Sequence, residues 1–203
     1  MFSRLAALFF GLALLLGLAE PAVAGTPEAE AVIREFSDQL LGLMKDGPKL
    51  SFAARVERIR PPVSKVFNMA AMTRSTLGAA ANKLSPEDSA HLAETYTEYS
   101  AATYASQFDE WDGERFEVGE ARPSSGGAIV VPSWIVPKTG DPTQLDYVLR
   151  EDQGQWRVVD ILFDGTVSQV AVRRSEFVSI YRAKGFSGLI ETLVAQTKAL
   201  GKN

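Results

Sequence analysis

Two aspartates at the end of a predicted strand have the residue type and spacing for acid–base chemistry. Asp160 and Asp164 flank the apolar run 161–163, and two carboxylates so placed can act as general acid and base. Aspartates in such positions more often form a turn or cap the following helix, and we favour that interpretation. The alternative is an isomerase-like enzyme, in which one aspartate lies beside an apolar cavity and acts on a hydrophobic substrate.

The sequence contains one histidine and no cysteine. His91 would have to be the base of any Ser–His–Asp triad, but no Gly-x-Ser-x-Gly motif accompanies it, so we interpret it as a surface residue. The lack of cysteine excludes disulfides, thiol catalysis and iron–sulfur clusters. A single histidine cannot supply the several histidine ligands of a multi-histidine zinc site. We therefore expect no catalytic residue, no metal site and no cofactor.

Two further motifs, one rich in glycine and one charged, have residue types that can bind anionic groups. The segment Ser124-Ser125-Gly126-Gly127 lacks the Lys-Ser/Thr pair of a phosphate-binding loop and joins two predicted strands, which favours a hairpin turn. Arg173 and Arg174 precede Ser175-Glu176, and a solvated helix face with a local Arg–Glu pair is the simpler interpretation. The alternative is that Arg173 and Arg174 contact an anionic head group or a partner carboxylate.

Composition limits the class of protein. The chain has 203 residues, 46% of them hydrophobic and 23% charged, with a net charge of −4, and this balance is typical of a globular protein rather than a disordered one. A pI of about 5.2 argues against a nucleic-acid partner, because such proteins usually present a basic patch.

The first 24 residues have the pattern of an export signal. Arg4 supplies a positive charge, residues 5–19 carry none, and Ala22-Val23-Ala24 is a small-residue cleavage motif. The uncharged run is shorter than the roughly 20 residues that span a bilayer. We therefore expect a secretory signal peptide over 1–24, cut after Ala24, and a mature chain, 25–203, that folds as a single α+β domain.

The elements that must position these residues follow from periodicity and capping residues. Helices are predicted over 27–45, over 51–60 with an end at Pro61-Pro62, from Asn68 as cap to about Leu77, from Ser85 as cap to about Trp111, from 166 or 168 to 184, and from Ser187 onward. Four strands are predicted over 115–122, 128–137, 143–150 and 155–163. Because short turns join them, we expect an antiparallel meander with helices on both sides in sequence.

Several of these elements are apolar on more than one face. The second strand alternates Ile129, Val131 and Ile135 with Val130, Trp134 and Val136, and the fourth sets Val159, Ile161 and Phe163 against Trp156, Val158 and Leu162. The long helix from Ser85 carries two apolar stripes. Such elements lie between two layers or line a cavity, so the surplus apolar side chains form either a second core or a ligand pocket.

Short motifs run in order along nearly the whole mature chain. They are Phe67-Asn68-Met69-x-x-Met72-x-Arg74-x-x-Leu77-Gly78, Leu84-Ser85-Pro86-Glu87, Asp146-Tyr147-x-Leu149, Gly154-x-Trp156-x-Val158-x-Asp160, Arg174-Ser175-Glu176-Phe177 and Gly185-x-x-Gly188-Leu189-Ile190-x-x-Leu193. The series resembles the signatures of the MlaC (toluene-tolerance) family of periplasmic lipid-binding proteins. Typical members read Glu-Gly-Val-Ser after the last strand, whereas this chain reads Asp164-Gly165-Thr166-Val167-Ser168-Gln169, which is more similar to the hopanoid-associated HpnM branch.

The resemblance implies a soluble periplasmic shuttle that makes and breaks no bond. Its partners would be a lipid (a glycerophospholipid or a hopanoid), an inner-membrane ABC/MCE-type transporter complex and an outer-membrane donor or acceptor. The implied fold is a twisted antiparallel sheet of about four strands, wrapped by the N- and C-terminal helices around an apolar lipid pocket. The side chains expected to line this pocket are Met69, Met72, Tyr96, Tyr99, Tyr104, Phe108, Trp134, Tyr147, Phe163 and Phe177.

Two other functions stay open at this level. One is the α+β enzyme described above, with Asp160 or Asp164 as its acid or base. The other is an adaptor that binds only proteins and has a filled core. A cavity in the structure would separate the lipid carrier from the adaptor, and the position of the two aspartates relative to that cavity bears on the enzyme.

Overall fold

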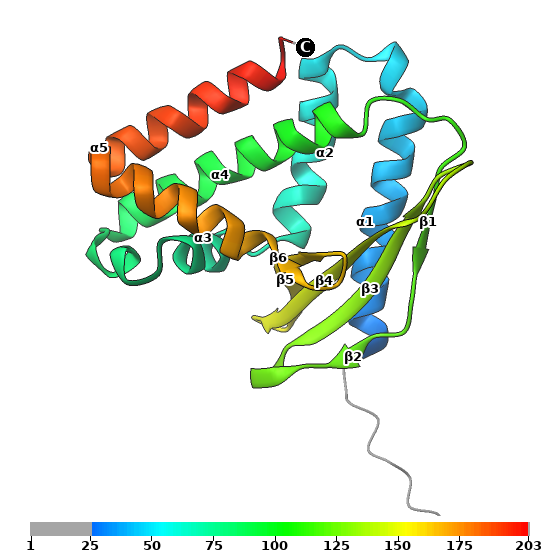
Figure 1. The fold of residues 1–203 in the computed structure, drawn as a ribbon, viewed down its shortest axis with the longest axis horizontal. Coiled ribbons are helices and arrows are strands. Elements are labelled where there is room, and N and C mark those ends of the chain that lie inside the picture. Colours follow the sequence, from blue (N-terminus) through cyan, green and yellow to red (C-terminus); the bar gives the residue numbers. More distant parts are fainter. Residues whose placement is uncertain (1–25, 203) are drawn as a thin grey trace, which may run out of the picture.

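The computed structural model describes residues 26–202, so the predicted signal peptide over 1–24 lies outside the described residues. Within that range the chain forms an α+β fold of five α-helices and a twisted antiparallel sheet (Figure 1). The helices are α1 (Thr26–Asp46), α2 (Phe52–Val66), α3 (Met69–Leu77), α4 (Pro86–Gln107) and α5 (Gln169–Leu200), with the short 3₁₀ helices η1 (Gly47–Lys49), η2 (Gly78–Lys83) and η3 (Ser125–Gly127). The strands are β1 (Arg115–Val118), β2 (Arg122–Pro123), β3 (Ile129–Val136), β4 (Thr143–Asp152), β5 (Gln155–Phe163) and β6 (Val167–Ser168).

The sheet has the strand order β1-β3-β4-β5-β6, with β2 also paired to β3, and all its pairs are antiparallel. One face packs against the helices. The side chains on this face form rows across neighbouring strands, as in Val131–Tyr147–Ile161 and Ile129–Leu149–Val158. Helix α1 lies along this face through Ile33, Phe36 and Leu40, which are buried, and contacts β1, β3 and β5.

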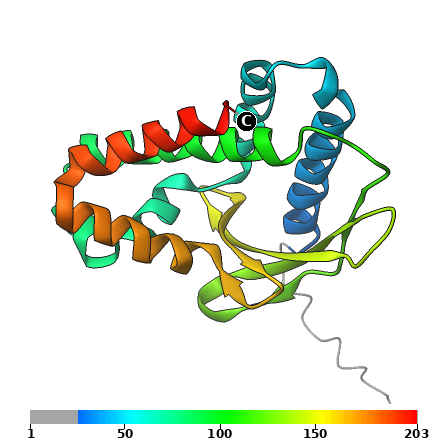
Figure 2. The same cartoon turned by 45° about the horizontal axis from the view of Figure 1, so that its top comes forward.

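Helix α5 consists of two helical halves that run in opposite directions (Figure 2). Between them, the backbone at Gly185 has φ 69° and ψ −168°, a conformation that essentially only glycine adopts. The first half, 169–184, packs near the sheet, and the second half, 186–200, returns beside α4. The predicted helix end at Gly185 and the predicted restart at Ser187 agree with this bend.

Local capping explains where several helices begin. The Ser85 hydroxyl accepts a hydrogen bond from the Asp88 N–H, and the Asn68 side chain accepts one from the Ala71 N–H. The Ser168 hydroxyl accepts one from the Ala171 N–H. Each pairing satisfies a donor that the first turn of a helix leaves free, so these three predicted starts are confirmed.

Two helix ends were predicted wrongly. Helix α2 continues through Pro61 and Pro62 to Val66, because Ile59, Val63 and Val66 form one buried stripe on both sides of the prolines. This packing outweighs the hydrogen bonds that proline cannot donate. Helix α4 ends at Gln107, before the predicted end at Trp111, whose side chain is 46% exposed in the polar loop that follows.

The strand predictions need two corrections. The predicted first strand is broken into β1 and β2, because Pro132 of β3 accepts a hydrogen bond from Gly119 but has no N–H to return. In β5, the register shifts opposite Val148 and Leu149, so that Leu149 pairs with Val158 and Val148 with Asp160. Val159 is the extra residue of this β-bulge, and the alternation of side chains between the two faces shifts by one residue across it. Val158 therefore shares the helix-facing side with Ile161, whereas simple alternation placed them on opposite faces.

Candidate functional site: an apolar cavity between the helices and the sheet

An apolar cavity of about 370 Å³ lies between α3, α4, the first half of α5 and the helix-facing side of the sheet. Side chains from all four parts of the fold line it. They are Phe67, Met69, Met72, Tyr96, Tyr99, Ser100, Thr103, Tyr104, Gln107, Phe108, Ile135, Thr143, Leu145, Ile161, Phe163, Gln169 and Arg173. The volume falls in the lower part of the roughly 300–1,000 Å³ typical of ligand pockets.

The α3 side of the cavity is held by polar contacts to the sheet. The Arg157 Nη2 atom donates to the carbonyl oxygens of Ser64 at 2.6 Å and Phe67 at 2.7 Å, and the Asn68 N–H donates to the Val158 carbonyl at 2.9 Å. These bonds fix the start of α3 against β5. Met69 at that start reaches the cavity together with Met72 one turn later, and thioether side chains adapt readily to contents of irregular shape.

Helix α4 supplies an aromatic wall. Tyr96, Tyr99, Tyr104 and Phe108 line the cavity, and the Tyr104 ring packs edge-on against Phe36 of α1 at 5.3 Å between centroids. Burial raises the pKa of the Tyr96 hydroxyl to about 12 and raises that of Tyr104 well above its usual value. Tyr96 and Tyr104 therefore stay uncharged at physiological pH.

Arg173 brings a positive charge to one side of this apolar cavity. Its guanidinium lies 5.2 Å from the centroid of the Tyr99 ring and 2.9 Å from the Glu176 carboxylate. Burial acts to lower the pKa of Arg173, but Tyr99 and Glu176 outweigh it, so the pKa lies above the usual value. Gln196, from the second half of α5, also donates to Glu176, at 2.8 Å. The charge is thus held in place by Tyr99 and Glu176, and Gln196 in turn holds Glu176.

Of the ten side chains predicted for the pocket, seven line this cavity: Met69, Met72, Tyr96, Tyr99, Tyr104, Phe108 and Phe163. The other three lie outside the lining. Trp134 is on the opposite face of the sheet, beside Glu117 and Gln144. Tyr147 is on the helix-facing side but is almost fully buried, and its ring packs edge-on against Phe36 at 6.4 Å between centroids. Phe177 is fully buried and packs edge-on against the Tyr96 ring at 5.4 Å, so it supports the wall from behind.

The two arginines do not act as a pair. Arg173 lines the cavity, whereas the guanidinium of Arg174 lies against Gly78 at the end of α3: a β-carbon on Gly78 would be 2.4 Å from the Arg174 Nη2 atom. Adjacent residues on a helix point about 100° apart, and of the two arginines only Arg173 lines the cavity. Arg173 therefore keeps the geometry for head-group contact, and Arg174 does not.

Several lining residues carry no distinctive chemistry and were not predicted. Leu145 and Ile161 reach the cavity from the sheet, Phe67 from the α2–α3 junction, and Ser100 and Thr103 from α4. The i, i+3 and i+4 spacing from Tyr96 through Ser100 and Thr103 to Tyr104 could have indicated the α4 residues. Alternation along β4, with Leu145, Tyr147 and Leu149 on one face, could have indicated Leu145. No local pattern indicated Ile161, since both faces of β5 are apolar.

The remaining residues with predicted chemistry lie away from the cavity lining. The Asp160 carboxylate accepts hydrogen bonds from the Ser168 hydroxyl at 2.5 Å and the Val170 N–H at 3.1 Å, so it caps α5 as we favoured. Asp164 is exposed in the turn after β5, where its φ is 50°. His91 is exposed on α4. Neither aspartate lines the cavity, and this geometry does not favour the enzyme hypothesis.

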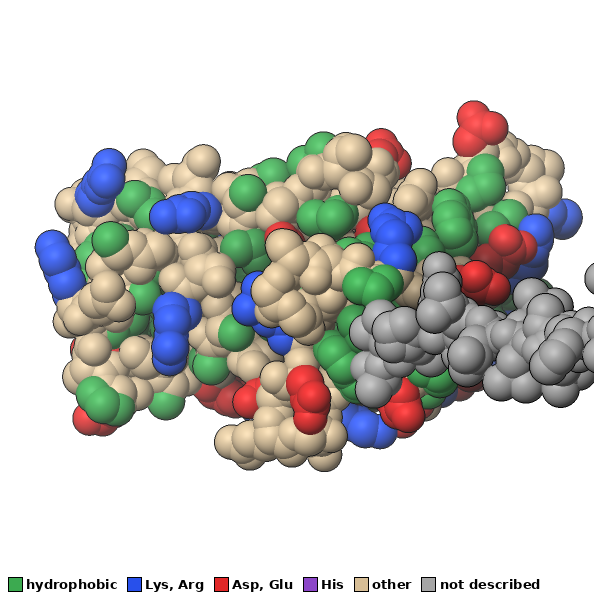
Figure 3. Space-filling view, turned by 90° about the horizontal axis from the view of Figure 1, so that it is seen from below, with side chains coloured by type: hydrophobic (Ala, Val, Ile, Leu, Met, Phe, Trp, Pro, Cys, Tyr) green, Lys and Arg blue, Asp and Glu red, His purple; other side chains and the backbone are tan. Residues whose placement is uncertain are grey.

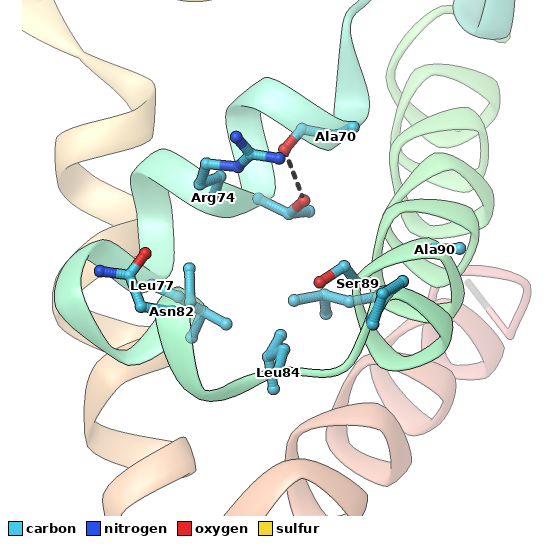
Figure 4. Close-up of a pocket in the computed structure, with 11 residues that line it drawn as sticks. Ala70, Arg74, Leu77, Asn82, Leu84, Ser89 and Ala90 are labelled. Carbon is cyan, nitrogen blue, oxygen red and sulfur yellow. Dashed lines mark hydrogen bonds between the residues drawn. The ribbon is translucent and has the colours of Figure 1, made fainter.

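A second hollow, of about 520 Å³, lies between α3, η2 and the start of α4. Figure 4 shows Arg74, Asn82 and Ser89 around it, with Leu77 and Leu84 on its sides. It is lined by a single stretch of chain, residues 70–92, and has no contribution from the sheet. Within residues 26–202, no group of three or more His, Asp or Glu side chains is arranged to hold a metal ion, and no helix is long and apolar enough to cross a membrane.

Comparison with known proteins agrees with the fold and the motifs. No curated protein matches the chain. A phospholipid-binding protein from Ralstonia solanacearum, whose structure was solved in complex with a phospholipid, has the same fold with a TM-score of 0.74 and 19% sequence identity. The match covers 86% of this chain and 99% of that protein. The profile of the family described as MlaC protein matches residues 34–195, and the chain therefore belongs to the MlaC family.

Proposed function

We propose that this protein is a lipid carrier that holds hydrocarbon in the cavity and makes or breaks no covalent bond. The observation that carries the proposal is the apolar cavity itself, lined by aromatic and methionine side chains, with Arg173 as its positive charge. The family and the phospholipid bound by the Ralstonia solanacearum protein support it. A filled core would have favoured the adaptor hypothesis instead.

The energetics explain why such a lipid needs a carrier. Each methylene group transferred from water to an apolar site gains about 0.8 kcal/mol, so a long acyl chain or a polycyclic triterpenoid crosses water rarely without a cover. In this protein, Tyr96, Phe108 and Leu145 line the cavity that would shield the hydrocarbon from water. Tyr96 and Tyr104, which burial keeps neutral, add no ionised group that would have to lose its hydration.

The cargo that fits best is a phospholipid with a hydrocarbon chain in the cavity and its phosphate near Arg173. A guanidinium can donate two parallel hydrogen bonds to a phosphate, and Tyr99 and Glu176 already hold this one in position. The HpnM-like sequence around Asp164 makes a hopanoid the second candidate. A hopanoid without an anionic group would use the apolar wall and leave Arg173 paired with Glu176.

The cellular setting is also part of the proposal. Residues 1–24 would direct export and be removed after Ala24, and the mature protein would work in the periplasm. There it would exchange lipid with an inner-membrane ABC/MCE-type transporter complex and with an outer-membrane partner. N-terminal sequencing of the protein recovered from a periplasmic fraction tests the export step.

A cavity-filling substitution tests the binding site. Thr103 lines the cavity from α4, so Thr103→Trp should fill part of it and lower the amount of lipid taken up from vesicles by roughly ten-fold, because the lost apolar contacts are worth more than 1.4 kcal/mol. Ser179→Trp adds the same indole on an exposed position of α5 and should bind as the unmodified protein does. Equal uptake by both variants would place the lipid elsewhere.

A further inference from the structure

The positive charge that Arg173 brings to the cavity is one half of an ion pair. Its Nη1 atom donates to the Glu176 Oε2 atom at 2.9 Å, and the Gln196 Nε2 atom donates to the other carboxylate oxygen, Oε1, at 2.8 Å. Burial acts to raise the pKa of Glu176, but the hydrogen bonds from Gln196 and Arg173 outweigh it, so the pKa lies below its usual value. A positive and a negative charge therefore lie side by side at the cavity.

Both charged side chains can be reached from solvent. The Arg173 side chain is 30% exposed and the Glu176 side chain 31% exposed. Arg173 lines the cavity, whereas Glu176 follows it by three residues on α5 and lies outside the lining. Residues three apart on a helix are neighbours, with about 5–6 Å between their Cβ atoms. A group bound to Glu176 would thus lie just outside the cavity, next to a group bound to Arg173.

Neighbouring side chains fix Glu176 in this position. Phe177, the next residue, is fully buried and packs edge-on against Tyr96 of the cavity wall, which anchors this turn of α5. Gln196 reaches Glu176 from the second half of α5, on the other side of the bend. The carboxylate is therefore pre-organised, and a ligand that binds to it does not have to order it first.

Both partners of the ion pair retain hydrogen-bonding capacity. A guanidinium has five N–H donors, and a carboxylate has about four lone-pair sites. Among the hydrogen bonds within residues 26–202, the Arg173 guanidinium donates one and the Glu176 carboxylate accepts two. The Nη2 atom of Arg173 is thus available to a phosphate, and each Glu176 oxygen can accept a further bond from a cationic donor.

This arrangement distinguishes lipid head groups by charge. The head group of phosphatidylglycerol has a phosphate and no cation, so it competes with Glu176 for the guanidinium and adds a second negative charge beside it. The head group of phosphatidylethanolamine carries a primary ammonium on a short linker beyond its phosphate. With the phosphate at Arg173 and the ammonium at Glu176, charges of opposite sign alternate, which is favourable for every neighbouring pair.

From these observations we propose that Glu176 accepts the ammonium group of a phosphatidylethanolamine whose phosphate binds Arg173, and that this makes the protein selective for a zwitterionic phospholipid. The inference rests on the proposed lipid-carrier function and specifies the head group of the cargo. An ammonium group can donate hydrogen bonds to a carboxylate, and such charge-assisted bonds are roughly twice as strong as neutral ones.

Competition for the cavity tests the selectivity. Phosphatidylethanolamine and phosphatidylglycerol with the same acyl chains are each used to displace a fluorescent lipid from the protein. Displacement is measured because basic side chains stand out at the end of the molecule where α5 bends (Figure 3), and they can attract anionic lipid that does not enter the cavity. The unmodified protein should bind phosphatidylethanolamine roughly ten-fold more tightly. Equal affinities, or a preference for phosphatidylglycerol, would overturn the proposal.

Glu176→Gln removes the negative charge and preserves the shape of the side chain. It should bind phosphatidylethanolamine about ten-fold more weakly than the unmodified protein does and phosphatidylglycerol at least as tightly, which also shows that the variant is folded. Equal losses for both lipids would mean that Glu176 only positions Arg173 and would refute the proposal.

Glu191→Gln is the matched control, because Glu191 is an exposed glutamate of α5 outside the cavity lining. It should bind both lipids as the unmodified protein does. The same change of preference in Glu191→Gln as in Glu176→Gln would reveal a general effect of net charge and would contradict a specific contact at Glu176. Unmodified protein that binds neither lipid would refute the carrier function itself.

Discussion

Substitution of Arg173 tests most directly which kind of lipid head group the protein binds. Its guanidinium is held by Tyr99 and Glu176 at the edge of an otherwise apolar cavity. Charge-assisted hydrogen bonds to a phosphate contribute about 1.5–3 kcal/mol, so Arg173→Met should weaken binding of a phospholipid by roughly ten-fold or more. Binding of an uncharged diacylglycerol should change little, since methionine preserves the apolar part of the side chain.

Arg174→Met is the matched control, because Arg174 lies against Gly78 rather than in the cavity. It should bind both lipids as the unmodified protein does, in a competition assay with a fluorescent lipid. Equal losses for phospholipid and diacylglycerol in Arg173→Met would show that the residue contributes packing and not head-group recognition.

The buried tyrosines predict how stability depends on pH. Burial raises the pKa of Tyr96 from 10.0 to about 12 and raises the pKa values of Tyr104 and Tyr147 as well. The folded protein thus retains protons that the unfolded chain releases above pH 10, and stability falls as pH rises wherever the folded state binds more protons. Urea unfolding should show this contribution in full below pH 10 and its progressive loss as pH rises towards 12.

Tyr96→Phe removes one of these titrating groups, so its stability should fall less steeply above pH 10 than that of the unmodified protein. Identical slopes for the two proteins would mean that the Tyr96 hydroxyl is not held neutral by burial in the cavity wall.

At the scale of elements, the bend in α5 depends on one glycine. Gly185 has φ 69° and ψ −168°, and a side chain in that region costs about 1–3 kcal/mol. Gly185→Ala should therefore lower the free energy of unfolding by that amount, measured by urea denaturation, although no atom crowds its β-carbon position. Gly42→Ala in the middle of α1 is the opposite case and should stabilise the protein by about 0.5–1 kcal/mol. A neutral Gly185→Ala would mean that the bend does not require glycine.

Several elements were predictable from the sequence because their signals are local. The caps Asn68 and Ser85 and the end of β5 at Phe163 are set by residues within one turn or one strand. The continuation of α2 through Pro61 and Pro62 was not predictable, since it depends on packing against distant parts of the chain.

The candidate site was predictable in part for the same reason. Helical spacing indicated two apolar stripes on α4, one with Tyr96 and one with Tyr104, and the expectation that both residues line one pocket came with the resemblance to the MlaC family. Both faces of β3 and β5 are apolar in sequence, so nothing local indicated that Trp134 faces away from the cavity. The β-bulge at Val159 changed which residues of β5 share a face, and bulges leave little trace in a pattern of apolar residues.

At the scale of the whole molecule, the described residues combine a packed hydrophobic core with an apolar cavity between the helices and the sheet. The described residues share one hydrophobic core cluster, which extends from Ile33 of α1 to Leu193 of α5. The cavity lies beside this core, and Arg173 and the partly exposed Phe163 line it. This combination of a packed core, an apolar cavity and one fixed charge at the edge of the cavity suits a protein that takes up and releases lipid.

The lipid content of the purified protein tests this central claim most directly. The protein is purified without detergent from a membrane-containing host, extracted with organic solvent and analysed by mass spectrometry, with the extract quantified against the protein. We predict phospholipid, or a hopanoid where the host makes one, in stoichiometric amount. An extract without stoichiometric lipid, from protein that also takes up none from liposomes, would contradict the lipid-carrier function.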